Sequence, residues 1–148
     1  MKVVLQRVSK ASVEVEDKII SSIEKGLLVL LGITEDDTKE DIEWLCKKII
    51  NLRIFNDEHE VMNESLIDIN GELIIVSQFT LMANTKKGNR PSYINAAKSE
   101  IAIPLYEQFI STIEELLGKK VGAGIFGANM KVNLLNDGPV TIIIDSKR

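Results

Sequence analysis

The stretch LIIVSQFTL, residues 73–81, decides the fold because it reads as a core strand that ends in polar side chains. Its first four residues are apolar, and valine and isoleucine close to Gly71 favour a buried strand over a short buried helix. If the strand continues to its end, alternation places Gln78 and Thr80 on one face and their neighbours on the other. The polar groups then need hydrogen-bond partners, either in neighbouring backbone or in a bound ligand.

Thr80 is a candidate nucleophile, but a hydroxyl needs an activating base. No histidine, lysine or acidic residue adjoins Thr80 in sequence, and the single histidine, His59, lies in a separate polar loop. The sequence therefore offers a hydroxyl without a visible base. This argues against a covalent mechanism unless folding brings a lysine or an aspartate to Thr80.

Composition describes an ordinary globular protein. Of 148 residues, 45% are hydrophobic and 27% are charged, which excludes a disordered or collagen-like chain and suits one domain over residues 1–148. The net charge of −4 argues against a nucleic-acid binder without sequence preference, because the affinity of such proteins comes mainly from phosphate neutralisation. A local basic patch is compatible with this charge.

Cysteine usage and hydropathy point to the cytoplasm. Cys46 is the only cysteine, which excludes an intrachain disulfide framework and a cysteine-cluster zinc site and suits a reducing compartment. No apolar stretch is long enough to span a bilayer, and the alternating, charged residues 1–16 differ from a signal peptide. The acidic loop around His59 lacks the spacing of a calcium loop. We expect a cytoplasmic protein with no membrane association, metal or cofactor.

Period-two alternation and apolar runs predict strands on both sides of the central stretch. These strands lie at residues 1–8, 10–16, 18–24, 27–33, 53–55, 121–126, 129–136 and 140–145. Gly32, inside the fourth of them, suggests a close backbone approach or a bulge. The NDGP segment, residues 136–139, is a turn signal before the last strand.

Apolar residues at helical spacing predict two amphipathic helices. The first follows Thr38, which can cap it together with Asp41. On its outer face, Glu43 and Lys47 are spaced as an i,i+4 ion pair. The second covers residues 100–117. Many strands with two helices predict an α/β fold, with mixed or antiparallel sheets packed as a sandwich or a barrel-like core and two main helices on one side.

One basic loop follows the central stretch directly. Residues 82–99 contain Lys86, Lys87, Arg90 and Lys98 and no acidic residue. Glycine and proline within the segment predict a loop. Two interpretations are open: a solvated loop, or an arm that contacts phosphates beside a pocket.

Besides SQFTL, the Gly138-Pro139 pair is a second candidate for a functional segment. Glycine lacks a Cβ, so its backbone can come close to a ligand. Proline donates no N–H, so the pair would present mainly carbonyl oxygens.

Together these motifs resemble the D-aminoacyl-tRNA deacylases of the bacterial and eukaryotic type, and the likeness runs nearly end to end. The combination of SQFTL and NDGPVT at this separation is specific, whereas neither motif is specific alone. The matching segments are QRV (6–8), ASV (11–13), GLLVLLG (26–32), RIF (53–55), MN (62–63), SQFTL (77–81), G-x-RPS (88–92), LY (105–106) and NDGPVT (136–141).

The resemblance implies a homodimer with its active site at the subunit interface. In the family, SQFTL lines a pocket for the 3′-terminal adenosine and the aminoacyl group of tRNA, and a Gly-cisPro motif enters it from the partner subunit. Arg7 matches the arginine that holds the Gly-Pro loop. The substrate-binding candidates are Ser77, Gln78, Phe79, Thr80, Gly138, Pro139, Arg7, Phe126 and Met130. The candidates for tRNA contact are Lys86, Lys87 and Arg90.

The implied reaction is hydrolysis of D-aminoacyl-tRNA to free tRNA and a D-amino acid, a chirality proofreading step in translation. L-residues would be rejected by the carbonyl oxygens of the Gly-Pro pair, and glycine, which has no side chain to reject, would also be removed from tRNA. The 2′-OH of the terminal ribose would activate water while backbone N–H groups stabilise the oxyanion. Thr80 and Gln78 are the catalytic candidates, and a chemical role for the Thr80 side chain is doubtful.

Two other functions stay open at this point. One is a hydrolase that uses Thr80 covalently on small D-aminoacyl esters. The other is a non-catalytic dimeric module that binds nucleic acid or protein.

Overall fold

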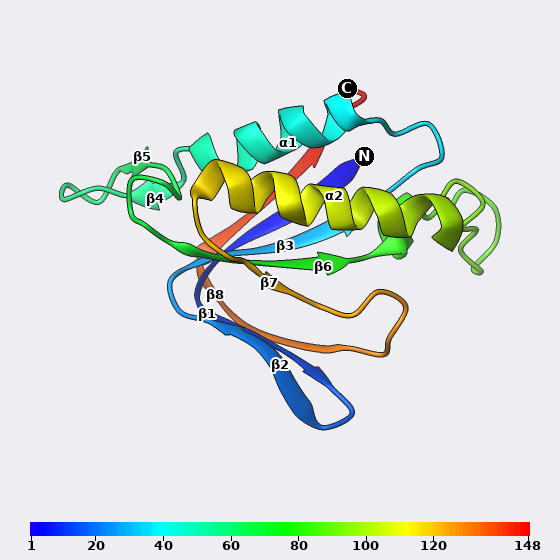
Figure 1. The fold of residues 1–148 in the computed structure, drawn as a ribbon, viewed down its shortest axis with the longest axis horizontal. Helices are drawn as coiled ribbons and strands as arrows, with labels where there is room; N and C mark the ends of the chain where they lie inside the picture. Colours follow the sequence, from blue (N-terminus) through cyan, green and yellow to red (C-terminus); the bar gives the residue numbers. More distant parts are fainter.

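A computed structural model describes residues 1–148 as a twisted mixed sheet with two helices packed across one face (Figure 1). The strand order is β2-β1-β3-β6-β7, and β8 pairs with the free edge of β1. The strands of this sheet are β1 (Lys2–Val15), β2 (Lys18–Ile23), β3 (Gly26–Gly32), β6 (Glu72–Ser77), β7 (Gly122–Ala123) and β8 (Lys131–Asp145).

The long strand β1 gives the sheet its nearly barrel-like curl. Its first half pairs antiparallel with β3, its second half pairs antiparallel with β2, and β8 pairs along almost its whole length. Two separate strands were expected here, at residues 1–8 and 10–16. They form one strand because β8 continues across the junction, pairing Val8 with Asn136 and Lys10 with Leu135.

The centre of the sheet is parallel. β3 pairs with β6 in parallel, and both are buried on each face, as their unbroken apolar runs predict. The crossover contains α1 (Lys39–Asn51) and a small two-stranded sheet of β4 (Phe55–Asn56) and β5 (Met62–Glu64). The second helix, α2 (Ser99–Leu117), leads to β7, which pairs with β6 in parallel.

Two hydrophobic clusters hold these layers together. The larger lies between the helices and one sheet face and includes Ile42 and Ile49 from α1 and Phe109 from α2. The smaller lies on the opposite face and joins β1, β2, β3 and β6 through residues such as Val13 and Ile74. The amphipathic spacing of both helices therefore predicts their packing correctly.

The SQFTL segment does not continue as a strand, contrary to the expectation of alternating faces. β6 ends at Ser77, and Phe79–Met82 form a 3-10 helix, η1. The amide of Gln78 donates the last ladder bond, to the Leu31 carbonyl (2.8 Å), and β3 itself ends at Gly32. The chain then turns because no partner strand is left. A Cβ on Gly32 would lie 2.8 Å from the Met82 side chain, so the close approach expected at this glycine is present.

NDGP is not a turn between two strands. β8 runs through it, and residues 137–140 loop out of the ladder because Gln6 pairs with Thr141 while Val8 pairs with Asn136. Four residues of β8 therefore face one residue of β1, which is a large bulge. Glycine and proline signal a departure from regular structure without distinguishing a bulge from a reversal.

The short strands are the least accurate part of the prediction. The strand expected at 121–126 is reduced to Gly122–Ala123, and the one expected at 53–55 lies at Phe55–Asn56. β5 was not predicted, because its sequence is polar and its pairing with β4 covers only two positions.

Asp41 ties the start of α1 to the end of the chain and should contribute acid-dependent stability. Although burial acts to raise its pKa, hydrogen bonds from Ser146, Lys147 and Thr38 hold the pKa well below the usual carboxyl range. The Lys147 ammonium lies 2.9 Å from the carboxylate, and the Thr38 amide donates to it at 2.8 Å. Because the folded-state pKa is depressed, this contribution is present above the ordinary carboxyl pKa and is lost as pH falls.

We expect Asp41→Asn to lower the free energy of unfolding by about 1.5–3 kcal/mol at pH 7, the range for a hydrogen bond to a charged group. The difference from wild type should shrink below about pH 4, because there the Asp41 carboxylate of the unfolded chain begins to protonate while that of the folded protein stays ionised. Urea unfolding between pH 3 and 8 measures this, with exposed Glu35→Gln as the matched control. A difference that does not change with pH would contradict the assignment.

Candidate active site

A cavity of about 300 Å³ opens at the carboxyl end of β6. Carboxyl ends of parallel strands are a common location for ligand sites in α/β sheets. The ends of β3 and β6 form its floor, the start of α2 one side, and the segment from residue 126 to 132 the other. Its lining is mostly apolar, and five of the predicted site residues take part. These are Ser77, Gln78, Phe79, Phe126 and Met130.

Thr80 is the second residue of η1 and does not line the cavity wall itself. Its hydroxyl accepts a hydrogen bond from Gln78 Nε2 at 2.5 Å, and no other side chain bonds to it. No histidine, lysine or carboxylate therefore contacts the hydroxyl, and folding does not bring in the base that was missing in sequence.

The backbone at the start of η1 is a second source of polar groups. The amides of Phe79 and Thr80 open the helix, so they have no intrahelical acceptor. Beside them, the Phe79 ring is 54% exposed and packs edge-on against Tyr93, with ring centroids 5.0 Å apart. The start of η1, next to the cavity, thus combines unpaired N–H groups with exposed aromatic rings, a combination suited to an oxyanion and an adjacent flat ring.

Tyr106 fixes the wall that carries Phe126. Its hydroxyl donates to the Ile75 carbonyl (2.7 Å), which also accepts from the Gly124 amide (3.3 Å). Its ring lies 5.9 Å from that of Phe126. Burial raises the pKa of Tyr106 to about 12, so the phenol stays a neutral donor. The sequence pattern gives no sign of the contact between Tyr106 and Ile75, although a buried tyrosine hydroxyl usually has a specific partner.

Arg7 holds the second candidate motif. Its side chain is buried, Nε donates to the Asp137 carbonyl (2.9 Å), and Nη1 donates to the Ile54 carbonyl (2.9 Å) and the Asn56 side chain (3.2 Å). The bulge of β8 is therefore fastened to the segment between α1 and β4. The acceptors at Ile54 and Asn56 were not predicted, because they depend on contacts between residues far apart in sequence.

Only glycine fits at position 138. Its φ is +132°, and a Cβ there would lie 2.9 Å from Arg7 Nη2. The Gly138-Pro139 peptide bond is cis, and both residues are exposed. The Asn136 side chain closes the base of the bulge by accepting from the Val140 amide (3.1 Å) and donating to Thr141 (3.0 Å).

Within one chain, the bulge and the cavity do not meet. The bulge faces Arg7, which pairs with Leu27 at the start of β3, whereas Leu31 at the end of β3 lines the cavity. Four residues of strand separate the two levels by about 13 Å. Figure 1 shows the same arrangement, with the middle of β8 at one end of the sheet and η1 at the other. Neither Gly138 nor Pro139 lines the cavity.

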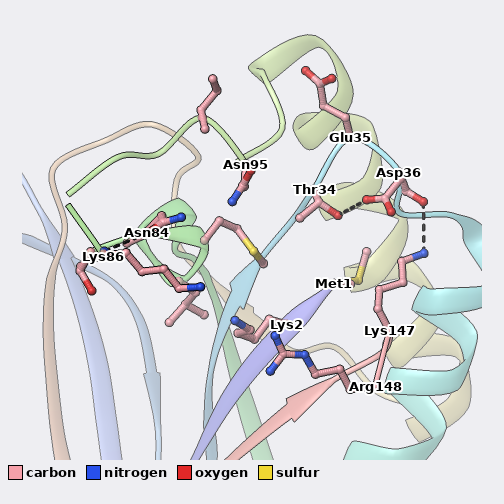
Figure 2. A pocket seen from close by; sticks show the side chains of 15 residues that line it. Met1, Lys2, Thr34, Glu35, Asp36, Asn84, Lys86, Asn95, Lys147 and Arg148 are labelled. Carbon is pink, nitrogen blue, oxygen red and sulfur yellow. Dashed lines mark hydrogen bonds between the residues drawn. The ribbon is translucent and has the colours of Figure 1, made fainter.

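A larger and more open hollow of about 720 Å³ lies on the other side of η1 (Figure 2). Lys86 of the basic loop lines it, together with Lys2 and Lys147, whereas Lys87 and Arg90 line neither hollow. Lys147 is already paired with Asp41. The smaller cavity is the candidate active site because it collects five of the predicted residues and is better enclosed.

The remaining candidates contribute little. Cys46 is buried, and burial raises the pKa of its thiol to about 12, so it is unreactive. His59 is exposed in its loop and lies near Glu58. No three metal-binding side chains cluster, and neither helix has the length and apolar character needed to cross a bilayer.

Comparison with known proteins gives a consistent result. Residues 4–145 match the family model described as D-Tyr-tRNA(Tyr) deacylase. Over 147 residues the chain is 69% identical to a D-aminoacyl-tRNA deacylase of Flavobacterium psychrophilum, covering 99% of this chain and 98% of the relative. A D-aminoacyl-tRNA deacylase of Bacteroides thetaiotaomicron is 62% identical with the same coverage.

Solved structures agree with this match. A structure titled c-Myc DNA Unwinding Element Binding Protein superposes with a TM-score of 0.93 at 41% identity, covering 98% of each chain. A probable eukaryotic D-amino acid tRNA deacylase superposes with a TM-score of 0.85 at 18% identity over 97% of each chain, which supports the fold alone. With the match extending through both the cavity motif and the bulge, the chain belongs to the D-Tyr-tRNA(Tyr) deacylase family.

Proposed function

We propose that the protein hydrolyses the ester bond of D-aminoacyl-tRNA, releasing free tRNA and a D-amino acid, and so proofreads chirality during translation in the cytoplasm. The observation that carries this proposal is the cavity built from SQFTL in a chain that is 69% identical, over nearly its whole length, to a D-aminoacyl-tRNA deacylase. The terminal adenosine and the aminoacyl group would occupy this cavity.

The working enzyme is a homodimer in which each cavity is completed by the Gly138-Pro139 bulge of the other subunit. Three features support this. The bulge is exposed, it is held rigidly by Arg7, and it lies about 13 Å along the strand from its own cavity. β8 also exposes large apolar side chains at Leu135 and Ile143, which a partner subunit would cover.

The bulge selects against L-residues by position. Backbone carbonyl oxygens at Gly138 and Pro139 would stand where an L-side chain projects, so that side chain would clash with them and strip them of water. A D-side chain projects elsewhere, so many different D-side chains should fit. Glycine has no side chain to exclude, so glycyl-tRNA is also a substrate.

The substrate supplies the base. The 2′-OH of the terminal ribose takes a proton from water as the water attacks the ester carbonyl. The amides of Phe79 and Thr80 stabilise the oxyanion, and Gln78 orients the acyl group. The intermediate collapses by breaking the bond between the acyl carbon and the ribose oxygen, which takes up the proton. This scheme accommodates the single hydrogen bond of the Thr80 hydroxyl, which comes from the Gln78 side-chain amide and not from a base.

The basic loop, residues 82–99, contacts phosphates of the RNA backbone. Lys86, Lys87 and Arg90 are exposed and form no ion pair within the chain. They follow η1 closely in sequence, so phosphates of a tRNA entering the cavity would pass near them.

Substrate stereochemistry tests the proposed selection. D-Tyr-tRNA and Gly-tRNA should be hydrolysed, and L-Tyr-tRNA should resist. Arg7→Lys keeps the charge but loses the guanidinium fork that binds three acceptors, so the bulge should loosen. The ratio of kcat/KM for D- over L-Tyr-tRNA should then fall about tenfold or more, since removing one charged hydrogen bond corresponds to about 1.5–3 kcal/mol.

The thermal midpoint of Arg7→Lys controls for loss of folding. Full resistance of Gly-tRNA alongside rapid cleavage of D-Tyr-tRNA would contradict selection by exclusion. An unchanged D/L ratio in a folded Arg7→Lys protein would remove the bulge from selection.

The source of the base is tested by comparing Thr80→Ala with a substrate ending in 2′-deoxyadenosine. Thr80→Ala should retain kcat within about tenfold, whereas the deoxy substrate should be cleaved about 10²–10⁴-fold more slowly, the contribution typical of general base catalysis. Single-turnover kinetics measures both. The opposite pattern, or an acyl-Thr80 adduct trapped for mass spectrometry, would establish the covalent alternative.

The basic loop is tested by salt dependence. Replacing Lys86, Lys87 and Arg90 with alanine should raise KM and leave kcat unchanged. The slope of log(1/KM) against log salt should become shallower by about 0.7–0.9 for each phosphate that the variant no longer neutralises. Lys18→Ala, in the β1–β2 turn and outside the basic loop, is the control. A slope equal to that of wild type would exclude the loop from the interface.

A further inference from the structure

A basic and aromatic depression on the outer surface of α1 has no role in the scheme above. It has a volume of about 430 Å³, and its lining contains three cations, one aromatic ring and no acidic residue. The lining residues are Trp44, Lys47, Lys48, Asn51, Leu52 and Arg53. A cluster of this kind is unexpected on a chain with a net charge of −4.

The cations of this depression are free to bind an anion. Glu43 pairs with Lys39 (3.7 Å) and not with Lys47, contrary to the i,i+4 pair expected from sequence, so Lys47 has no ion-pair partner. Arg53 donates Nε to the Asn63 carbonyl (2.9 Å), and its terminal nitrogens make no hydrogen bond within the chain. The positive charge of Arg53 helps to lower the pKa of Asp68, but the two side chains form no ion pair. The Asp68 carboxylate instead accepts a hydrogen bond from the Ser65 amide (2.8 Å).

Trp44 is the aromatic part of the surface. It is 45% exposed on the polar side of α1, where packing against the sheet does not explain it. Lys48 Nζ lies 5.5 Å from its ring centroid. Exposed aromatic rings flanked by cations are the surfaces on which unpaired bases stack while their phosphates are neutralised.

The depression lies at the same end of the molecule as the Gly-Pro bulge. Arg53 directly precedes the segment from Ile54 to Asn56, which holds Arg7 and, through it, the Asp137 carbonyl. Figure 1 places the last turn of α1 and the β4–β5 pair at this end of the sheet, away from η1. If the bulge enters the cavity of a partner subunit, the depression lies at the end of this subunit that approaches that cavity.

We propose that this depression binds the acceptor end of the tRNA whose aminoacyl group lies in the partner subunit's cavity. Lys47, Lys48 and Arg53 bind phosphates, and Trp44 stacks on an unpaired base. The inference rests on the proposed function and adds to it a second RNA contact, made by the subunit opposite to the one that holds the ester.

Kinetics on a long and a short substrate test the contact. Lys47→Glu, Lys48→Glu and Arg53→Glu should each raise KM for D-Tyr-tRNA several-fold and make the salt slope shallower by about 0.7–0.9. Trp44→Ala should raise KM about 5- to 150-fold, the range for removing one base stack. Hydrolysis of D-tyrosyl-adenosine, which cannot reach the depression, should be unchanged in all four. Lys18→Glu is the matched charge control.

Fluorescence anisotropy with uncharged tRNA gives a readout that does not depend on hydrolysis. Weaker binding by the four variants, with Lys18→Glu equal to wild type, supports the proposal. If the four variants fold and their KM and tRNA affinity equal those of the wild-type protein, the proposed RNA contact is overturned while the proposed function stays intact. A wild-type protein that hydrolyses neither substrate would instead overturn the proposed function.

A heterodimer separates the two subunits. One chain has its cavity closed by Ala97→Trp, so only the other chain can hold the ester. Lys48→Glu placed on the closed chain should raise KM, and the same change on the open chain should have no effect. The reverse result would place the contact within one subunit and overturn the proposal.

Discussion

The structure depends on the way one buried guanidinium is satisfied. Arg7 lies in the middle of β1, where its charge would be costly without partners. Its partners are two backbone carbonyls and an amide oxygen from two chain segments, residues 54–56 and Asp137. β8 leaves the ladder opposite Arg7, and the displaced segment offers the Asp137 carbonyl to Nε of the arginine. The contact fastens the bulge to β1, and the closeness of Arg7 Nη2 leaves no room for a Cβ at position 138.

The cavity lies at the other end of the sheet, where the strands end and backbone groups have no hydrogen-bond partner. β3 and β6 stop at the same level, and η1 turns away across Gly32, leaving the first amides of the 3-10 helix without acceptors. Tyr106 then anchors the far wall by sharing the Ile75 carbonyl with Gly124. The result is a site made largely of backbone and apolar surface, which explains why no catalytic side chain stands out in the sequence.

Periodicity predicted the elements whose side chains face a core. The first helix was expected from Thr38 and the second over 100–117, close to the observed α1 and α2, and the strand expected at 27–33 matches β3. Cavity residues such as Ser77 and Phe126 were identified, the second only through the family resemblance. The 3-10 helix in SQFTL and the bulge in NDGP could not be predicted, because both depend on which strands continue alongside them. The partners of Arg7 and the hydroxyl contact of Tyr106 are long-range, and single-residue patterns carry no information on them.

The bulge in β8 also has a consequence for solubility. β8 has 15 residues and pairs only with β1, so its second edge presents a long row of unsatisfied backbone groups. An uninterrupted edge of that length is a template on which further chains can add as strands, the first step of ladder-like aggregation. By displacing residues 137–140, the bulge divides the edge into two short segments on either side. The same four residues that shape the binding motif therefore protect the free chain from indefinite sheet extension before it finds a partner.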